Sequence, residues 1–455
     1  MGERANPCAG RTIRPPVQSE QAIQKASRTT AQVQRNVVLG ILNGTLMRVL
    51  DTLAGPSLVL PWFVAQLGGS AVAVGLLLPI TAGGWFLPQL LMARSVHSLP
   101  QKLPLFRAVS AIRVVLWIIM VIITLVAGAT NPTLTLWSFI VLYTLFCFGS
   151  GVSGLSWFDV IARAIPANQR GQFFGWRDFT GGILAIGASV LVGVTLNEAT
   201  GPKFPHNYGL LLALAGVAAA AGYYAFGKID EPPPERSATA STGAQCAPVD
   251  WRAPLLDRSF RLFVLARIAL LAANVALPFF GLYAKERLGA PDDMAGTYSG
   301  ALTAAMVVST LVWGRLSDRK GNLLLLRLVS AGFLVLSVLP LVFGPRASYL
   351  AYTVVFVLMG AASSGSDIAS LAMGLELAPP EQRSAYLGLL NSALGVVSLL
   401  LVLGGWIVER WGLEAVFLLS AAMSVVAVIT VFGLSDPRGS VRSAALTHNL
   451  EENGS

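Results

Sequence analysis

The sequence carries little charge for its length. Of its 455 residues only 12% are Asp, Glu, Lys or Arg, whereas 54% are apolar. A soluble domain has about twice that share of charged residues, because it has to cover a surface in contact with water. Lipid removes this need, since the outside of a membrane protein is as apolar as its inside. The composition therefore excludes an ordinary soluble domain and predicts a membrane protein.

Residues that serve metal, redox and nucleotide chemistry are also scarce. No Gly-x-x-x-x-Gly-Lys-Ser/Thr loop for ATP phosphates is found, and no basic cluster is interleaved with aromatic residues. These features predict no metal, no cofactor, no nucleic-acid partner and no enzymatic activity. The few histidines and cysteines have neither metal-ligand nor redox spacing; they are His97, His206, His448, Cys8, Cys147 and Cys246.

Long apolar runs are what the sequence has in abundance. A helix needs roughly 20 apolar residues to cross about 30 Å of hydrocarbon, and the short alternating strands of a membrane barrel are not seen. We therefore predict an all-α membrane protein with twelve transmembrane helices. The twelve runs cover residues 38–66, 70–93, 104–128, 133–161, 178–197, 208–227, 260–284, 296–314, 323–344, 348–375, 385–408 and 413–433.

The basic residues are unevenly divided between the two sides of this topology. Most of the 32 Lys and Arg residues fall on the side that holds both termini. Cytoplasmic loops are enriched in basic residues, so both termini are predicted to be cytoplasmic, in a cell (plasma or inner) membrane. The opposite side holds only Lys203, Lys285, Arg287, Arg346 and Arg410.

Polar segments divide the chain into parts. Residues 1–36 and 435–455 are predicted cytoplasmic tails, and residues 229–258, rich in Pro, Ser, Thr and Ala, form a predicted cytoplasmic linker. Six spans precede the linker, in residues 37–228, and six follow it, in residues 259–434. The chain is therefore expected to consist of two six-helix bundles.

An internal repeat supports this division. Residues 163–178 (RAIPANQRGQFFGWRD) align without gaps with residues 376–391 (ELAPPEQRSAYLGLLN). Each copy lies between the fourth and fifth spans of its half, on the predicted cytoplasmic side. Duplicated halves are common in transporters, so the two bundles are expected to be pseudo-symmetric.

The loop after the eighth span carries a recognisable motif. Residues 314–322 read GRLSDRKGN, which resembles the G-x-L-[SA]-D-R-x-G-[RN] signature of the major facilitator superfamily. Residues 376–383 (ELAPPEQR) resemble the E-x-x-P-x-x-x-R element that accompanies it. The corresponding loop of the first half, residues 92–98, lacks Asp-Arg-x-Gly. The resemblance implies a monomer in the lipid bilayer whose two bundles rock about a central site for a small-molecule solute.

Polar stripes mark the spans that line the cavity in this family. A charged residue within a span costs at least about 2.5 kcal/mol on insertion scales, so each one needs a reason. Spans one, seven and ten carry such stripes. They supply five candidates for substrate binding or ion coupling: Arg48, Asp51, Arg267, Asn274 and Asp367.

Each candidate has an alternative. Arg48 and Asp51 are three residues apart, so they could form a structural ion pair, and Arg267 could extend to the membrane surface. Asp367 lies among serines, which makes it the preferred protonatable group, although a lone carboxylate also suits a cationic substrate. The two arginines would then hold an anionic part of the substrate or neutralise the carboxylates. Arg113, in span three, is predicted to be a structural partner.

A second group of candidates lies on the cytoplasmic side. We predict that charges in the motif and the repeat hold the two bundles together there: Asp318, Arg319, Glu376 and Arg383, with Asp159 and Arg170 in the first half. These charges could instead simply stop the spans from sliding in the membrane.

The functional prediction is a secondary transporter of a small organic solute, with protons as the expected coupling ion. The alternative is a non-transporting assembly factor or scaffold with the same fold. Import and export both remain open. Proline is absent from residues 178–200, which disfavours the drug/proton antiporters of the family because they usually carry Gly-Pro in span five.

Overall fold

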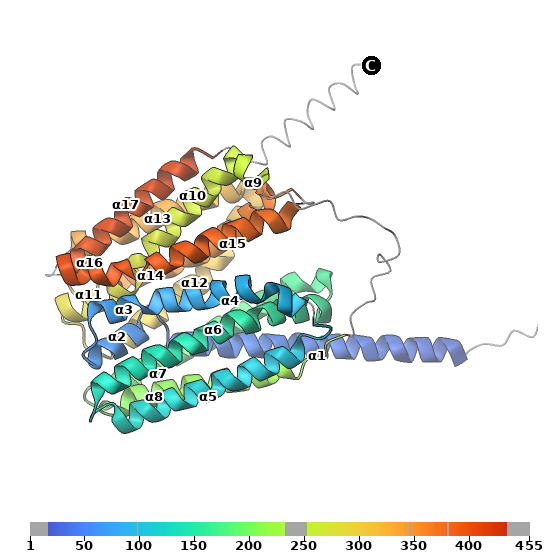
Figure 1. Cartoon of the computed structure of the whole chain (residues 1–455), viewed down its shortest axis with the longest axis horizontal. Coiled ribbons are helices and arrows are strands. Elements are labelled where there is room, and N and C mark those ends of the chain that lie inside the picture. The colour runs from blue at the N-terminus through green and yellow to red at the C-terminus, as the bar shows by residue number, and fades with distance from the viewer. Residues whose placement is uncertain (1–16, 98, 233–252, 345–346, 380–381, 435–455) are drawn as a thin grey trace, which may run out of the picture.

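The computed structural model describes residues 17–97, 99–232, 253–344, 347–379 and 382–434, and helices make up most of them (Figure 1). Eleven helical segments in these ranges are long and apolar enough to cross a membrane. The predicted all-α membrane class is confirmed. The α-helices are α1 (Val17–Leu53), α2 (Val59–Gln66), α3 (Ala71–Gly75), α4 (Leu77–His97), α5 (Leu103–Ala127), α6 (Pro132–Ala164), α7 (Arg170–Leu196), α8 (His206–Gly227), α9 (Ala253–Leu256), α10 (Arg258–Ala273), α11 (Leu277–Arg287), α12 (Met294–Lys320), α13 (Asn322–Phe343), α14 (Thr353–Leu377), α15 (Arg383–Leu400), α16 (Leu403–Trp411) and α17 (Leu413–Phe432).

The first predicted span is divided between α1 and α2. Pro56 has no backbone N–H, and its ring disfavours helical geometry at Gly55. The chain turns here, and the N–H of Leu60 donates to the carbonyl of Gly55 at 3.0 Å. This span, divided between the long α1 and the eight-residue α2, is not among the eleven candidate spans.

Span seven, the counterpart of span one, is interrupted as well. Its first part, α10, ends at Ala273, and a 3-10 turn, η3, covers Asn274–Ala276. The second part, α11, has Pro278 in its first turn, where the missing N–H costs no helical hydrogen bond. Interruptions at corresponding positions of two repeats are a recognised indicator of a transport site.

The helices form two bundles (Figure 1). In the first, α1 packs against α7 and α8, and α6 packs against α4 and α5. In the second, α12 packs against α14, and α17 packs against α10 and α13. The bundles meet along two seams, one between α7 and α12 and the other between α3–α4 and α15–α16.

At one end of the molecule, the two backbones come into direct contact across both seams. We call it the closed end; it holds α2, α3, α11 and α16, on the left of Figure 1. A Cβ atom added to Gly75 would lie 2.8 Å from the Cα of Gly405, and one added to Gly296 would lie 2.4 Å from the backbone nitrogen of Gly193. Only glycine permits such an approach.

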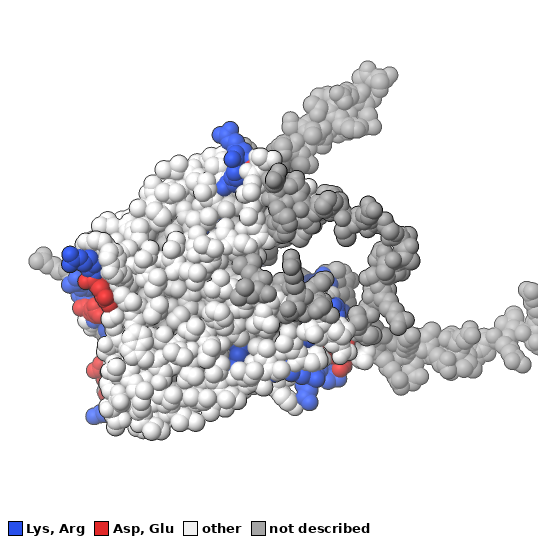
Figure 2. Space-filling model, in the orientation of Figure 1, with Lys and Arg blue, Asp and Glu red and all other residues white. Residues whose placement is uncertain are grey.

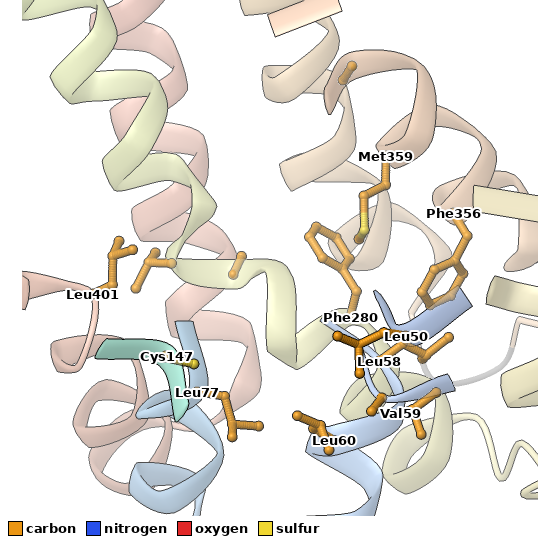
Figure 3. Close-up of a cluster of buried hydrophobic side chains, with 14 of the residues drawn as sticks. Leu50, Leu58, Val59, Leu60, Leu77, Cys147, Phe280, Phe356, Met359 and Leu401 are labelled. Carbon is orange, nitrogen blue, oxygen red and sulfur yellow. The ribbon is translucent and has the colours of Figure 1, made fainter. Parts of the chain in front are cut away.

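Apolar side chains from both bundles fill the space beside these contacts. Figure 3 shows Leu50, Leu58 and Val59 of the first bundle next to Phe280 and Phe356 of the second. All five are buried. We call them the apolar plug; they seal the middle of the molecule from the closed end.

The other end, where α8 ends and α10 begins, is less tightly packed, and we call it the open end. A Cβ atom on Gly175 of α7 or on Gly314 of α12 would meet no atom within 4 Å. The same two helices touch at Gly193 and Gly296 near the closed end. The seam between α7 and α12 therefore widens toward the open end.

The outer surface of the bundles is suited to lipid. Figure 2 shows most of the visible charged residues near the two ends, with a broad uncharged belt between them. On α5, the side chains of Ile112, Val115, Ile122 and Val126 are more than half exposed. An apolar belt of this kind is expected where hydrocarbon, not water, surrounds a helix.

The sequence repeat is also a repeat of backbone structure. The N–H of Gln169 donates to the carbonyl of Pro166 at 3.0 Å, and the N–H of Gln382 donates to that of Pro379 at the same distance. Each copy thus ends one helix, makes a turn and starts the next, at Arg170 in α7 and Arg383 in α15. The predicted tails, apart from residues 17–36, and most of the linker lie outside the described residues.

Candidate functional site

A cavity of about 310 Å³ lies between the bundles, on the open side of the apolar plug. Its walls come from α1, α7 and α12, and polar side chains from all three face it. The size suits a small organic molecule, since ligand pockets measure roughly 300–1,000 Å³. The charged lining residues are Arg48, Asp51 and Asp178, joined by the hydroxyl-bearing residues Thr52, Ser57, Ser299, Thr303 and Thr310.

Arg48 forms its ion pair with a residue of another helix. Its Nη2 lies 3.6 Å from Oδ1 of Asp178 on α7, and its Nη1 lies 3.9 Å from the sulfur of Met306 on α12. The expected pair with Asp51 is not formed. Gly181 explains the difference, because a Cβ there would lie 2.8 Å from Cγ of Arg48. The missing side chain lets the arginine cross the face of α7 and reach Asp178.

Asp51 consequently faces the cavity without a direct cation. Its side chain is exposed and forms no ion pair with any residue that the structure describes. It lies in the last turn of α1, just before the break at Gly55 and Pro56. The hydroxyl of neighbouring Thr52 donates to the carbonyl of Arg48 at 2.9 Å, within the last turns of the same helix.

The second bundle contributes a matching group from α10 and α14. Nη1 of Arg267 donates to the hydroxyl of Ser366 at 3.0 Å, while its Nε is buried without a partner. Asp367, the next residue, is exposed, and within the described ranges it forms no ion pair. Two of the serines near Asp367 make other contacts, since the hydroxyl of Ser366 accepts from Arg267 and that of Ser370 donates to the carbonyl of Ser366.

Asn274 lies in the 3-10 turn that interrupts span seven. Its side-chain Oδ1 is buried and has no hydrogen-bond partner. An unpartnered buried acceptor costs about 1–3 kcal/mol, so a site that a ligand or water can reach is a natural place for it. The amide therefore remains a candidate contact for a substrate.

Arg177 and Asp178 were not predicted as site residues. Arg177 was assigned to the cytoplasmic surface, because the predicted fifth span begins only at residue 178. In the structure α7 begins at Arg170, which places both residues two turns inside the helix. Small residues (Gly181, Gly182, Gly187, Ser189 and Gly193) form a stripe along α7, and Asp178 precedes Gly181 at helical spacing. Extending the stripe would have identified the carboxylate.

The structure places Arg113 where a structural partner was expected. It is buried, and its Nε donates to the carbonyl of Phe146 at 3.1 Å. A second bond joins its Nη1 to the hydroxyl of Ser153 at 3.3 Å, and its guanidinium stacks on the ring of Phe146 at 4.2 Å. These contacts hold α5 against α6.

The candidates for the cytoplasmic charge cluster lie at the open end. Two of them make contacts inside the first bundle: Asp159 lies 4.0 Å from Lys102, and Arg170 donates to the carbonyls of Ala162 and Ile165 at the end of α6. Asp318 and Arg319 are exposed in the last turn of α12 and form no ion pair with residues in the described part of the chain.

The remaining two belong to the second copy of the repeat. Glu376 lies in the last turn of α14, and Arg383 is the first residue of α15. The side chain of Arg383 lies outside the described part of the structure, so the predicted contact between these two residues is not tested.

Two helical bundles around a charged central cavity, closed at one end, define an integral membrane protein of the solute-transporter class. The family model of the Major Facilitator Superfamily matches residues 262–449, and a solved transporter structure of the same fold matches 88% of the chain. Residues 262–449, most of which lie in the second bundle, thus match the major facilitator superfamily, a family of transporters and not of enzymes.

Two similar proteins are distant in sequence. Multidrug resistance protein MdtG of Dickeya zeae (strain Ech586) is 28% identical over 194 residues, which cover 41% of this chain and 45% of the relative. The chain thus matches about half the length of that relative. The nucleoside transporter NupG shares 14% identity with a TM-score of 0.64, over 88% of this chain and 98% of its own.

A bacterial homologue of the iron transporter ferroportin is similar in two conformations. Its inward-facing structure has a TM-score of 0.62 at 15% identity, covering 88% of this chain and 98% of its own. Its outward-facing structure, soaked with iron, has a TM-score of 0.54 at 15% identity, over 87% and 98%. Identities this low establish the fold alone.

Proposed function

We propose that the protein is a secondary transporter that carries a small organic solute across the membrane by alternating access, coupled to the proton gradient. The observation that carries this proposal is the one-sided closure of the molecule. The bundles touch at Gly193–Gly296 and Gly75–Gly405 and enclose the apolar plug at one end. A charged cavity lies between them on the other side of the plug. Rocking of the bundles would expose this cavity to either side in turn.

We place the open end, both termini and the linker in the cytoplasm of a cell membrane. The distribution of Lys and Arg supports this orientation, and so does the higher similarity to the inward-facing than to the outward-facing ferroportin homologue. In a cysteine-free background, Lys228→Cys should resist a membrane-impermeant maleimide added to intact cells. Ready labelling there would reverse the orientation.

Proton coupling is assigned to one carboxylate from each bundle, Asp51 and Asp367. Carboxylates inside a membrane are costly and, where they have no cation partner, commonly form proton relays. Both side chains are exposed, and neither pairs with a cation of the described chain. Asp367 remains the first choice. The sequence-based argument against Asp51 no longer holds, because Arg48 pairs with Asp178 instead.

The charges at the open end are proposed to join the bundles when that end closes. Asp318 and Arg319 are free of ion pairs while the seam between α7 and α12 is wide. As the ends approach, they would meet charges of the facing bundle. The motif and its resemblance to the family signature motivate this role.

A distance measurement across the open end tests alternating access. Gly175→Cys and Gly314→Cys place spin labels on α7 and α12 at positions where a side chain meets no neighbour. Pulsed electron paramagnetic resonance should show a long and a short distance, and acidification should change their ratio. In Asp367→Asn that change should be lost, or reduced if Asp51 shares the role. A single distance at every pH would favour the scaffold alternative.

A further inference from the structure

A second cavity, of about 380 Å³, lies inside the first bundle. Residues of α1, α4, α5, α6, α7 and α8 surround it, and none of them lines the cavity between the bundles. Its volume falls in the range of small-molecule pockets. The cavity is therefore a separate place in which part of a solute can bind.

Aromatic rings form much of its wall. Trp157 lies at the centre, with its ring centroid 5.1 Å from that of Phe158 and 6.2 Å from that of Phe174. Phe158 in turn contacts Trp85 of α4 at 6.3 Å. Each of these residues lines the cavity. Flat apolar walls of this kind favour a planar, apolar molecule, because offset and edge-on ring contacts add to the energy of burial.

The charge of this cavity has one sign. Arg113 and Arg177 both line it, and among the described residues no Asp or Glu does. The guanidinium of Arg177 lies 5.2 Å from the ring centroid of Trp157, and its buried Nε has no hydrogen-bond partner. Its nearest carboxylate, Asp178 at 3.9 Å, is shared with Arg48. The guanidinium of Arg177 thus keeps hydrogen-bonding capacity that no described residue uses.

Glycines make room for both arginines. A Cβ on Gly44 of α1 would lie 2.0 Å from Nε of Arg177, and one on Gly149 of α6 would lie 2.8 Å from Cγ of Arg113. Each long side chain lies in a slot that any larger residue would fill. The backbone therefore fixes the two cations at the cavity and prevents them from extending to the membrane surface.

Counting charges across the interior of the first bundle points to the same ligand. Arg48, Arg113 and Arg177 stand against two carboxylates, Asp51 and Asp178. Because Arg113 and Arg177 are largely buried, their positive charge is costly unless an anion balances it. A ligand with a single negative charge would supply the missing partner.

We propose that this cavity binds the planar, apolar part of an organic monoanion, and that Arg177 bonds its acidic group. This proposal rests on the proposed function, because it names the substrate class of the same transporter. The anion would enter from the open end and lie beside Asp178, between the aromatic cavity and the cavity between the bundles.

Three probes of one shape test the preference for charge. Naphthalene-2-carboxylate, 2-naphthalenemethanol and 2-naphthylmethylamine differ in charge but hardly in the ring they present. Binding to the purified full chain is measured by calorimetry and by the shift of the melting temperature. The carboxylate should bind at least about tenfold more tightly than the alcohol, as expected for one charge-assisted hydrogen bond. The amine should bind no better than the alcohol.

Variants locate the site. Arg177→Gln should remove the preference for the carboxylate and leave binding of the alcohol within about twofold, whereas Arg177→Lys should restore part of it. Gly44→Ala should weaken binding of the carboxylate by displacing Arg177. Arg410→Gln, an exposed change at the closed end, is the control and should bind like the parent protein.

The outcomes separate this proposal from the proposed function. Equal binding of the three probes, tighter binding of the amine, or an unchanged preference in Arg177→Gln would each overturn the anion site. None of these results would affect the spin-label distances across the open end. Conversely, a selective site for the carboxylate in a protein with one fixed conformation would support the pocket and argue against transport.

Discussion

The contact between Gly296 and Gly193 yields the sharpest prediction of the structure. A methyl group in Gly296→Ala would lie 2.4 Å and 2.5 Å from backbone atoms of Gly193 and 2.6 Å from the carbonyl oxygen of Ser189. Ordinary contacts of a Cβ atom begin at 3.4 Å, so α7 and α12 must move apart by about 1 Å. Backbone cannot rotate out of the way as a side chain can. The added methyl group should therefore destabilise mainly the conformation shown by the structure, in which the bundles touch at the closed end.

Overpacking of this kind costs about 1–3 kcal/mol. When the bundles separate at the closed end, the methyl group no longer clashes. The population of this conformation, relative to the one shown by the structure, should therefore rise by about 5- to 150-fold. Spin labels at Glu198 and Glu286, one on each bundle near the closed end, should report a longer distance. Labels at Gly175 and Gly314 should report a shorter one, because the two ends open in alternation.

The same helix offers a matched control. Gly314→Ala introduces the same methyl group on α12 where no described atom lies within 4 Å, so it should leave the distance between labels at Glu198 and Glu286 unchanged. If Gly296→Ala lowers the melting temperature but alters neither distance, the glycine contact is mere packing. Equal effects of the two variants would refute the reasoning.

Three further predictions concern charged residues. Asp318→Asn should lower the population with the short distance between labels at Gly175 and Gly314, because it removes a charge proposed to hold the open end closed; an unchanged ratio would contradict that role. Glu231→Gln should lower the melting temperature well beyond Asp230→Asn. The buried side chain of Glu231 accepts from the N–H groups of Lys102 and Leu103 at 3.0 and 2.9 Å and pairs with Arg163 at 3.2 Å, contacts worth roughly 1–3 kcal/mol. Equal melting temperatures of the two variants would refute this prediction. Asp178→Asn should lower the free energy of unfolding by about 1 kcal/mol because it releases Arg48 and Arg177; the amount is modest since the pair is partly exposed. Asp51→Asn should leave the melting temperature nearly unchanged. A larger loss in Asp51→Asn than in Asp178→Asn would instead indicate that Arg48 pairs with Asp51.

The fold was predictable because a bilayer restricts what a chain can do. Each apolar run has to satisfy its own backbone hydrogen bonds, so length and hydropathy identify a helix without knowledge of its neighbours. The turn after Pro166 was predictable for a related reason, since its copy at Pro379 has the same local sequence pattern. Interruptions of spans one and seven, near Gly55 and Asn274, were less apparent because apolar residues continue through both.

The partners within the site were not predictable from one sequence. Spacing along α1 permitted the pair of Arg48 with Asp51, but the side chain instead reaches across Gly181 to Asp178. That choice depends on how α1 and α7 are rotated about their axes, which hydropathy does not specify. The cavity around Arg177 has the same origin, since six helices contribute to it and no segment alone contains its pattern.

The interruption at Gly55 and Pro56 has a consequence for how the transporter can evolve. Where a helix stops inside the membrane, the peptide groups of the chain itself become available as donors and acceptors. Asp51, Gly55 and Pro56 all border the cavity between the bundles, so some of its polarity comes from atoms that every amino acid possesses. Replacing single side chains cannot delete those atoms. Changes of selectivity should therefore arise mostly at positions such as Thr303 and Met306 on the facing helix, while recognition through the peptide groups persists across variants.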